Sequence, residues 1–421
     1  MSANGSFTAD AQGEQRTPHS LRLSGERYDF IIAGGGAAGL SLALHLARSS
    51  LRDRSIVIID QNAEARSDRT WSFWTNRPTL FDEAVCRSWN RLRIVYGDAE
   101  KVIDLGGYRY NMIRDIDLYR FARRELSAQA NVTFVEGHVN RIEDGVDEAR
   151  VIAGRHTFTG QWVFDSTFGP SGNIPDPARY HDLKMHFKGW EIETSTPAFD
   201  PQAATFLDFR TPQKQSVRFF YVLPLSERRA LVEYTLISPA VLRSGEYEQV
   251  LRAYLEQTLG IPEYRLVREE GGVLPLTDRP FARRLGQRIM AIGAKGGRVK
   301  PTTGYAFTRI QRDSAAILQS LLNAGHPFDV PEDSARYRLY DALMLDIMSR
   351  HGEAVQSIFG ALFKHNPVDR VFRFLDETGS VWENLALIAT LPPRLFLQAI
   401  PRLAERRSAP SNRGRVEAVN G

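Results

Sequence analysis

A glycine-rich turn near the start of the chain constrains the fold more than any other feature. The turn Gly34-Gly35-Gly36-Ala37-Ala38-Gly39 follows an apolar stretch, Tyr28 to Ala33, and opens an apolar helical pattern from Ala37 to Arg48. A second apolar stretch, Ser55 to Asp60, then ends in an acid. This order of strand, turn, helix and strand predicts a βαβ unit of the Rossmann type.

The same turn predicts a dinucleotide site. Gly34 permits the tight turn, Gly36 lets the backbone approach a pyrophosphate, and Gly39 allows the helix to pack closely on the strand. The phosphates would lie at the N-terminus of the helix, where free amides and the helix dipole favour negative charge. Asp60, about twenty residues beyond the last glycine, is placed to hold a ribose hydroxyl.

The pattern of the later residues predicts two further structural regions. A helix near Asp117 to Gln129 and strands at Val132 to Glu136 and Trp162 to Asp165 extend the first region. Longer alternating strands then favour an inserted antiparallel sheet; they are His186 to Glu193, Ala204 to Phe209, Val217 to Pro224, Ala230 to Ile237 and Gly271 to Pro275. The chain returns to the first region with the strand Ile289 to Gly293 and a helix from about Thr303 to Leu322, and it is mainly helical from Pro331 through Leu403.

We therefore expect a mixed α/β fold. Residues 27–180 and 281–330 are predicted to form a Rossmann-like cofactor domain, 181–280 an antiparallel substrate domain, and 331–407 a helical region with membrane contact. The polar segments 1–26 and 408–421 are expected to be a disordered arm and tail.

Composition and charge exclude several classes of protein. The net charge of +4 and the pI near 9.1 are mild, so we expect no nucleic-acid partner. Cys86 is the single cysteine, which predicts no intramolecular disulfide, no metal site and a cytoplasmic location. The first residues carry neither a basic segment nor an apolar one, so we expect no secretory leader. The longest apolar run, Phe30 to Leu44, contains four glycines and is therefore better explained by the βαβ unit than by a membrane span.

A single acid interrupts the apolar strand Ala230 to Ile237. Burial of Glu233 would remove its solvation and favour the neutral, proton-donating form. Strand alternation places Leu231, Glu233 and Thr235 on one face and the even-numbered residues, including Tyr234, on the other. The alternative is that Glu233 lies on the solvent face of an edge strand, because charged residues are mostly exposed.

Two other segments resemble hydroxylase-type flavoproteins. Gly293-Ala-Lys-Gly-Gly297 and Pro301-Thr-Thr-Gly304-Tyr-Ala-Phe307 precede a helix that contains Asp313-Ser314. Val163-Phe-Asp165-Ser166 is similar to the Asp-Gly motif of those proteins, with serine in place of glycine. The resemblance implies FAD, with the late helix aimed at the flavin. Ala294 stands where a hydroxylase usually has aspartate.

Taken together, the segments resemble the FAD-dependent lycopene cyclase family, of the bacterial lycopene beta-cyclase type. The segments that carry the resemblance are Arg69-Thr-Trp71-Ser-Phe73-Trp74, Phe219-Phe-Tyr221-Val-Leu-Pro224-Leu, Leu231-Val-Glu233-Tyr-Thr235, Gly272-Val-Leu-Pro275, Thr302-Thr-Gly304-Tyr305 and Phe374-Leu-Asp376-Glu377 with Leu391-Pro392 downstream. The resemblance implies the FAD domain of hydroxylases and geranylgeranyl reductases. It also implies the cofactor contacts, which are Gly34, Gly36, Gly39, Asp60, Arg69, Gly293, Gly297, Thr303 and Gly304.

The reaction implied by the resemblance is an isomerisation without net redox change, in which ψ-end groups of lycopene become β-rings to give gamma-carotene, beta-carotene or both. Glu233 corresponds to the first of two adjacent acids in the family, and Tyr234 replaces the second. The flavin is expected in its reduced form, with NAD(P)H as reductant. A reduced anionic ring would stabilise a substrate cation and favour a neutral Glu233.

Aromatic faces are the other expected means of stabilising a cation. The candidates are Trp71, Phe73, Trp74, Phe220, Tyr221, Tyr234, Tyr305 and Phe307. The final base stays open among the flavin, Glu233, Asp208 and Glu270, as do the number of rings formed and their isomer. An FAD-dependent monooxygenase or halogenase, an isoprenoid reductase and a non-catalytic isoprenoid carrier are the alternative functions.

A hydrocarbon substrate implies contact with a membrane surface, from the cytoplasmic side and without a spanning helix. The segment Leu395-Phe-Leu397 and the C-terminal arginines are the candidate contacts. These arginines are Arg394, Arg402, Arg406, Arg407, Arg413 and Arg415. Association with other carotenoid enzymes is a further expectation.

Overall fold

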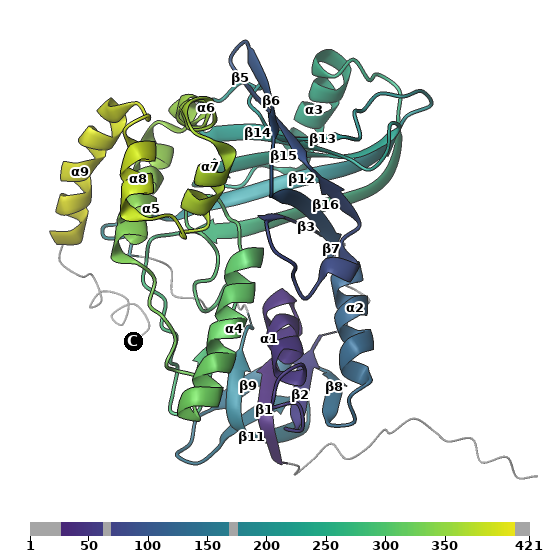
Figure 1. The fold of residues 1–421 in the computed structure, drawn as a ribbon, viewed down its shortest axis with the longest axis vertical. Helices are drawn as coiled ribbons and strands as arrows, with labels where there is room; N and C mark the ends of the chain where they lie inside the picture. Colours follow the sequence, from purple (N-terminus) through teal and green to yellow (C-terminus); the bar gives the residue numbers. More distant parts are fainter. Residues whose placement is uncertain (1–26, 62–68, 168–175, 409–421) are drawn as a thin grey trace, which may run out of the picture.

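The computed structural model describes residues 27–61, 69–167 and 176–408. In Figure 1 a lower part, built on one sheet, meets an upper part, built on a second sheet, and helices from the C-terminal third lie against one end of the upper part. The expectations for 1–26 and for 409–421 lie outside the described residues.

The lower part contains the predicted βαβ unit. Strand β1 (Arg27–Ala33) lies parallel between β2 (Ile56–Asp60) and β11 (His156–Asp165), and α1 (Ala37–Ala47) follows β1. Within the described residues the sheet order is β8 (Val132–Glu136), β2, β1, β11, β10 (Ala149–Ala153) and β9 (Val139–Glu143), with β17 (Ile289–Ala291) paired to β11. Helices α1, α2 (Asp115–Ser127) and α4 (Phe307–Ala324) contribute to the apolar core of this part.

The upper part is a mostly antiparallel sheet. For the described residues its order is β16 (Arg265–Leu276), β12 (Leu183–Glu193), β15 (Arg229–Ser238), β14 (Val217–Pro224), β13 (Ala203–Asp208), β5 (Arg91–Tyr96) and β6 (Ala99–Asp104). Strands β5 and β6 were predicted to lie in the cofactor domain, but β5 pairs in parallel with β13 of the upper sheet. The alternation of apolar and polar residues in β5 and β6 predicts strands with one buried face. A strand in either sheet could bury one face, so the pattern does not indicate which of the two sheets these strands join.

A small sheet connects the two parts. Strand β7 (Arg109–Arg114) lies between β3 (Thr70–Thr75) and β4 (Arg87–Trp89), and η2 (Asp82–Ala84) lies in the connection between β3 and β4. One face of the upper sheet packs on α3 (Ser244–Ala253) and η3 (Tyr254–Thr258). The other face contributes to a core shared with the C-terminal helices.

The region from Ala335 to Ser408 is helical, as predicted. It comprises α5 (Ala335–Arg350), η4 (Gly352–Ala354), α6 (Val355–His365), α7 (Val368–Leu375), α8 (Val381–Ile388) and α9 (Pro393–Ser408). In the part of the chain that the structure covers, no helix combines the length and apolar character that crossing a bilayer requires.

The late helix begins later than expected. It was predicted to start at about Thr303, but α4 starts at Phe307. Gly304 has a φ of 72°, a left-handed conformation that a right-handed helix cannot contain, so Thr303 and Gly304 lie in a turn before it.

Candidate active site

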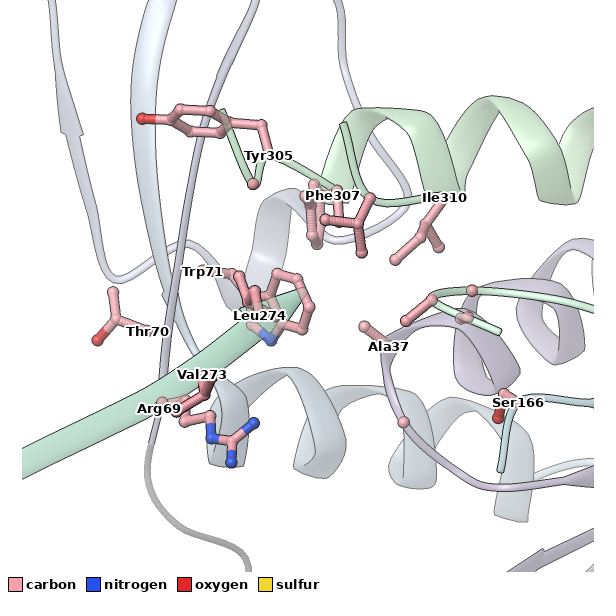
Figure 2. Close-up of a pocket in the computed structure, with 18 of the residues that line it drawn as sticks. Ala37, Arg69, Thr70, Trp71, Ser166, Val273, Leu274, Tyr305, Phe307 and Ile310 are labelled. Atoms are coloured by element: carbon pink, nitrogen blue, oxygen red, sulfur yellow. The ribbon is translucent and has the colours of Figure 1, made fainter. Parts of the chain in front are cut away.

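A cavity of about 1130 Å³ lies where the two parts of the molecule meet. Its lower end is formed by the turn after β1, the end of β2 and Ser166 after β11, and its upper end by residues of β3, β12, β14, β15 and β16. Figure 2 shows Ala37 and Ser166 on one side of this space and Thr70, Trp71 and Leu274 on another, with Phe307 and Ile310 from α4 above them.

The lower end has the geometry of a dinucleotide cradle. Gly34 and Gly36 line the cavity, and a Cβ placed on Gly36 would meet no atom within 4 Å. Gly39 does not line the cavity; a Cβ there would lie 2.1 Å from the carbonyl oxygen of Gly34, so only glycine allows α1 to lie this close to the turn. Asp60 lines the cavity at the end of β2. These residues therefore fit the dinucleotide predicted from the sequence.

Ser166 stabilises the glycine turn directly. Its hydroxyl is 3.0 Å from the carbonyl oxygen of Ala33 and 2.9 Å from that of Gly34, and it donates to them. The serine that replaces glycine in the Asp-Gly motif thus ties the end of β11 to the turn after β1. Asp165, the preceding residue, accepts from the Lys295 ammonium and from the Thr167 hydroxyl.

The predicted second flavin segment lines the cavity only in part. Gly293, Thr303 and Gly304 line it, together with Arg69 from the start of β3. Gly297 does not; its φ is 73° and its Cα packs against Phe281, so its role is in the turn itself. The first residues of α4 line the same space, and a helix N-terminus carries a partial positive charge.

Glu233 lies at the upper end of the cavity. It is on β15, which is hydrogen-bonded to β12 on one side and β14 on the other. The edge-strand alternative is therefore wrong. Leu231, Glu233 and Thr235 line the cavity, whereas Val232 and Tyr234 pack in the core under α3, as the alternation predicted.

The surroundings of Glu233 favour its protonated form. Burial, followed by the charge of Glu270, raises the pKa of Glu233 well above its usual range. The hydroxyl of Thr235 donates to Glu233 Oε1 at 2.9 Å and opposes the shift only in part. Such an environment favours the neutral carboxyl group, which is the form that can donate a proton.

Four of the predicted aromatic residues line the cavity, namely Trp71, Tyr221, Tyr305 and Phe307. Tyr110 on β7 also lines the cavity and was not among the predicted aromatic residues. Its hydroxyl lies 3.3 Å from that of Tyr305, which lies 3.2 Å from that of Tyr221, so three tyrosine hydroxyls meet in a chain. Alternation along β7 could have assigned Tyr110 to a buried face, but no local signal indicates which space that face borders.

The structure does not bring the other four aromatic residues to the cavity. Phe220 and Tyr234 stack at 4.9 Å on the α3 side of the sheet, because they are one residue out of phase with Tyr221 and Glu233. The Tyr234 hydroxyl accepts from Arg218 at 3.2 Å, so it cannot replace a second acid at the cavity. Phe73 and Trp74 are packed in the two main cores, and neither lines the cavity.

Two acids considered as the final base differ in position. Asp208 accepts from Arg210 and from the Tyr254 hydroxyl at 2.6 Å, and it does not line the cavity. Glu270 is buried on β16 and accepts from Thr70 and Arg268, each at 2.7 Å. Of the two, only Glu270 contributes to the pKa of Glu233.

The late acidic segment supports the cavity from outside. Glu377 accepts from Lys300 and from Arg309, each at 2.9 Å, and Lys300 also donates to Asp341 at 3.0 Å. Lys300 is buried and precedes the Thr303 turn. These ion pairs hold the turn before α4 against the C-terminal helices.

Solved structures with this fold include flavoenzymes. A flavoprotein/dehydrogenase from Cytophaga hutchinsonii matches with a TM-score of 0.60 and 12% identity, over 83% of this chain and 91% of that one. A geranylgeranyl bacteriochlorophyll reductase-like protein from Thermoplasma acidophilum matches with a TM-score of 0.55 and 13% identity, over 90% and 99%. This chain therefore has the fold that these two proteins share, as predicted.

Sequence comparison identifies the family of this chain. The family described as "Lycopene cyclase protein" matches residues 29–400, so the chain belongs to the lycopene cyclase family. A lycopene beta-cyclase from Pantoea ananas is 26% identical over 66% of this chain and 71% of its own length. A chloroplastic lycopene beta cyclase from Arabidopsis thaliana is 25% identical over 67% of this chain, which spans only 57% of that longer protein.

Proposed function

We propose that the protein is a lycopene beta-cyclase in which Glu233 protonates a ψ-end group and starts ring closure. The observation that carries the proposal is a carboxyl group with a raised pKa, placed among aromatic side chains at the end of a cavity that begins at a dinucleotide cradle. Membership of the lycopene cyclase family supports a carotenoid substrate.

FAD is the cofactor that the cavity fits. The turn Gly34 to Gly36, Asp60 and the N-terminal end of α4 would hold it, with Gly293 and the Thr303 turn beside the flavin. In its reduced form the bound cofactor supplies negative charge close to the developing substrate cation. NAD(P)H is the proposed source of the electrons, which are not consumed by the isomerisation.

The side chains of the chain account for the proton steps. Glu233 gives its proton to the terminal double bond of the ψ-end, and the π-electrons of that bond form the new C–H bond. An internal double bond then captures the resulting tertiary cation and closes the ring. Loss of a proton to the Glu233 carboxylate forms the ring double bond, so atoms and electrons balance and the acid is restored.

Aromatic faces stabilise the cation between these two steps. Trp71, Tyr221, Tyr305 and Phe307 line the cavity, and Leu223, Leu231 and Leu274 make the same space apolar. Such a lining excludes water, which would otherwise trap the cation as an alcohol, and it strengthens the cation–π attraction.

We further propose that the C-terminal helices contact the membrane that holds the substrate. Val381, Trp382 and Leu385 on α8 and Leu397 and Ile400 on α9 are exposed apolar side chains, and Trp382 is 80% exposed. Tryptophan is typical of membrane interfaces. Of the arginines expected to contact lipid, Arg394 and Arg407 are exposed. Two others have internal partners: Arg402 pairs with Asp346, and Arg406 donates to the carbonyl oxygen of Pro177.

The test of the proposed reaction compares Glu233→Gln and Glu233→Asp with the wild type, using lycopene in vesicles and FAD reduced in the absence of oxygen. Glu227→Gln, an exposed acid in the turn between β14 and β15, is the matched control. We expect cyclic products from the wild type and the control, and at least about a hundred-fold less from Glu233→Gln.

Other results would contradict the proposal. Full turnover by Glu233→Gln would show that Glu233 is not the proton donor. Oxygen consumed in proportion to product would indicate a monooxygenase, and hydride transferred to the product would indicate an isoprenoid reductase. Cyclisation at the same rate with oxidised FAD, or without FAD, would show that the reaction does not need the reduced cofactor.

A further inference from the structure

We propose that Glu270 is a positioning residue for Glu233, accepting a hydrogen bond from its protonated carboxyl group over the gap left by Gly189. The two acids would thus form a pair that shares one proton. The second acid would come from strand β16 and not from position 234, the next residue in the chain. The catalytic consequence of this pair rests on the proposed function, whereas its existence does not.

The register of three strands brings the two acids together. Gly189 on β12 is paired with Glu233 on β15 at one side and with Glu270 on β16 at the other. Residues in register across strands point to the same face of a sheet. A Cβ on Gly189 would lie 2.9 Å from Glu270 Cγ and 3.5 Å from Glu233 Cβ. Both side chains therefore lean over the glycine, and only a residue without a side chain leaves this space open.

One oxygen of Glu270 lacks a donor. Thr70 and Arg268 both donate to Glu270 Oε2 at 2.7 Å. Glu270 Oε1 is buried and, among the described residues, has no hydrogen-bond partner. A buried carboxylate oxygen without a donor is unfavourable, and the proton of Glu233 is a donor that could reach it.

The charges around the pair place the proton on Glu233. Burial raises the pKa of both acids, that of Glu233 well above its usual range, and Arg268, which opposes both shifts, is bonded to Glu270. Tyr110 and Tyr221, which face Glu233 from β7 and β14, are neutral phenols whose pKa values burial raises further. Among the described residues no cation pairs with Glu233, whereas Glu270 pairs with Arg268, which also binds Glu191 at 3.1 Å. The proton resides on Glu233, and Glu270 remains the acceptor.

This arrangement has two consequences for the proposed reaction. The negative charge of Glu270 keeps Glu233 protonated to a higher pH than burial alone would achieve. Of the two acids only Glu233 lines the cavity. After Glu233 gives up its proton, the two carboxylates lie side by side, and their mutual repulsion favours the return of a proton to Glu233 when the ring double bond forms.

The first test measures protonation of Glu233 without any substrate. Infrared difference titration follows the C=O band of a protonated carboxyl group, and the band lost in Glu233→Gln assigns it. In Glu270→Gln we expect this band to disappear at a pH lower by about one unit or more. The control is Glu269→Gln, which changes the preceding acid on β16. Glu269 pairs with Lys188 at 3.2 Å and is 47% exposed.

Variants with side chains of different size distinguish loss of the Glu233–Glu270 hydrogen bond from a general folding defect. Glu270→Asp keeps the charge and is expected to restore most of the wild-type titration. In Gly189→Ala the new methyl group would separate the two acids, so the band should shift in the same direction as in Glu270→Gln. Gly245→Ala, where a Cβ meets no atom within 4 Å, is the matched control.

Activity provides the second test. The alkaline limit of cyclisation should move to lower pH by the same amount as the infrared band, with kcat reduced near neutral pH and KM little changed. An unchanged Glu233 titration in both Glu270→Gln and Gly189→Ala would overturn the inference and leave the proposed function intact. If the band shifts in these variants but the wild-type protein cyclises no lycopene, the result would support the Glu233–Glu270 pair and refute the proposed function.

Discussion

Trp74 on β3 donates its indole N–H to Asp376 at 2.8 Å, although 302 positions separate them in the chain. The Asp376 carboxylate also accepts from Thr308, in the first turn of α4, at 3.2 Å. One buried acid after α7 thus connects the small sheet, the helix that borders the cavity and the C-terminal helices. The aromatic ring of Trp74 was predicted to stabilise a cation, but its position makes it a structural contact.

We expect Asp376→Ala to lower the free energy of unfolding by about 1–3 kcal/mol, because it leaves the buried Trp74 N–H without its acceptor. Urea unfolding followed by tryptophan fluorescence measures the change. Asp369→Ala is the control, since Asp369 is exposed by about half and, among the described residues, forms an ion pair with Arg373 four residues later, for which about 0.5 kcal/mol is expected. Equal losses in the two variants would contradict the structural role of Asp376.

Gly39→Ala should abolish FAD retention. The added Cβ would lie 2.1 Å from the Gly34 carbonyl oxygen, so α1 would have to move away from the turn that faces the cofactor. Visible absorbance of the purified protein after reconstitution with FAD measures the occupancy. Gly107→Ala, where a Cβ meets no atom within 4 Å, should bind FAD like the wild type. Normal occupancy in Gly39→Ala would argue against this cradle.

Neighbouring aromatic residues on β14 should have different roles. Tyr221→Leu removes a ring that lines the cavity, and we expect about tenfold slower cyclisation with little loss of stability. Phe220→Leu removes a ring stacked at 3.6 Å on Tyr254 on the far side of the sheet, and it should lower stability by about 1–2 kcal/mol at nearly normal turnover. Chromatography measures the rate of product formation and thermal unfolding measures stability, so the two measurements together distinguish the two roles. The reverse pattern would mean that the face assignment is wrong.

His181 should make stability depend on pH. It is buried, 3.0 Å from Asp278 and 3.7 Å from Asp346, and these carboxylates raise the pKa of the imidazole against the opposing effects of burial and of Arg406. Because the folded-state pKa exceeds the unfolded value of 6.5, the stabilisation is complete below about pH 6.5 and is lost as pH rises through the folded-state pKa.

The measurement is urea unfolding at several values between about pH 6 and pH 9. We expect the wild type to lose stability toward the alkaline end and His181→Asn to be less stable at pH 6 but flatter across the range. His326→Asn, at a histidine for which no carboxylate partner is found among the described residues, should keep the wild-type slope. An unchanged slope in His181→Asn would exclude this histidine as the source.

The exposed apolar side chains of the C-terminal helices should determine membrane binding. Replacing Trp382 and Leu397 together by serine removes two side chains that are 80% and 64% exposed. We expect about tenfold weaker binding in flotation with vesicles of mixed neutral and anionic lipid. Val146→Ser, at a similarly exposed apolar residue in the connection between β9 and β10, is the control. Undiminished flotation of the double variant would locate the membrane contact elsewhere.

Local patterns in the sequence were sufficient for the elements with short-range signals. The turn from Gly34 to Gly39 predicted β1, α1 and β2, since tight turns and helix starts depend on neighbouring residues. Alternation along β15 correctly separated Glu233 from Tyr234, because the side-chain period of a strand is local. It could not decide whether β15 was an edge strand, because strand neighbours are set by pairing over long distances.

The sequence by itself therefore determined the βαβ cradle, the period that places Glu233 on one face, and the family. Only the tertiary structure decided which space that face borders, that Glu270 and Tyr110 lie around the acid, and that Trp74 binds an acid from the C-terminal third. The physical reason is the distance along the chain over which the interactions act. Turns and alternation arise from steric contacts between near neighbours, whereas the pKa of a buried acid depends on charges that strand register brings from distant parts of the chain.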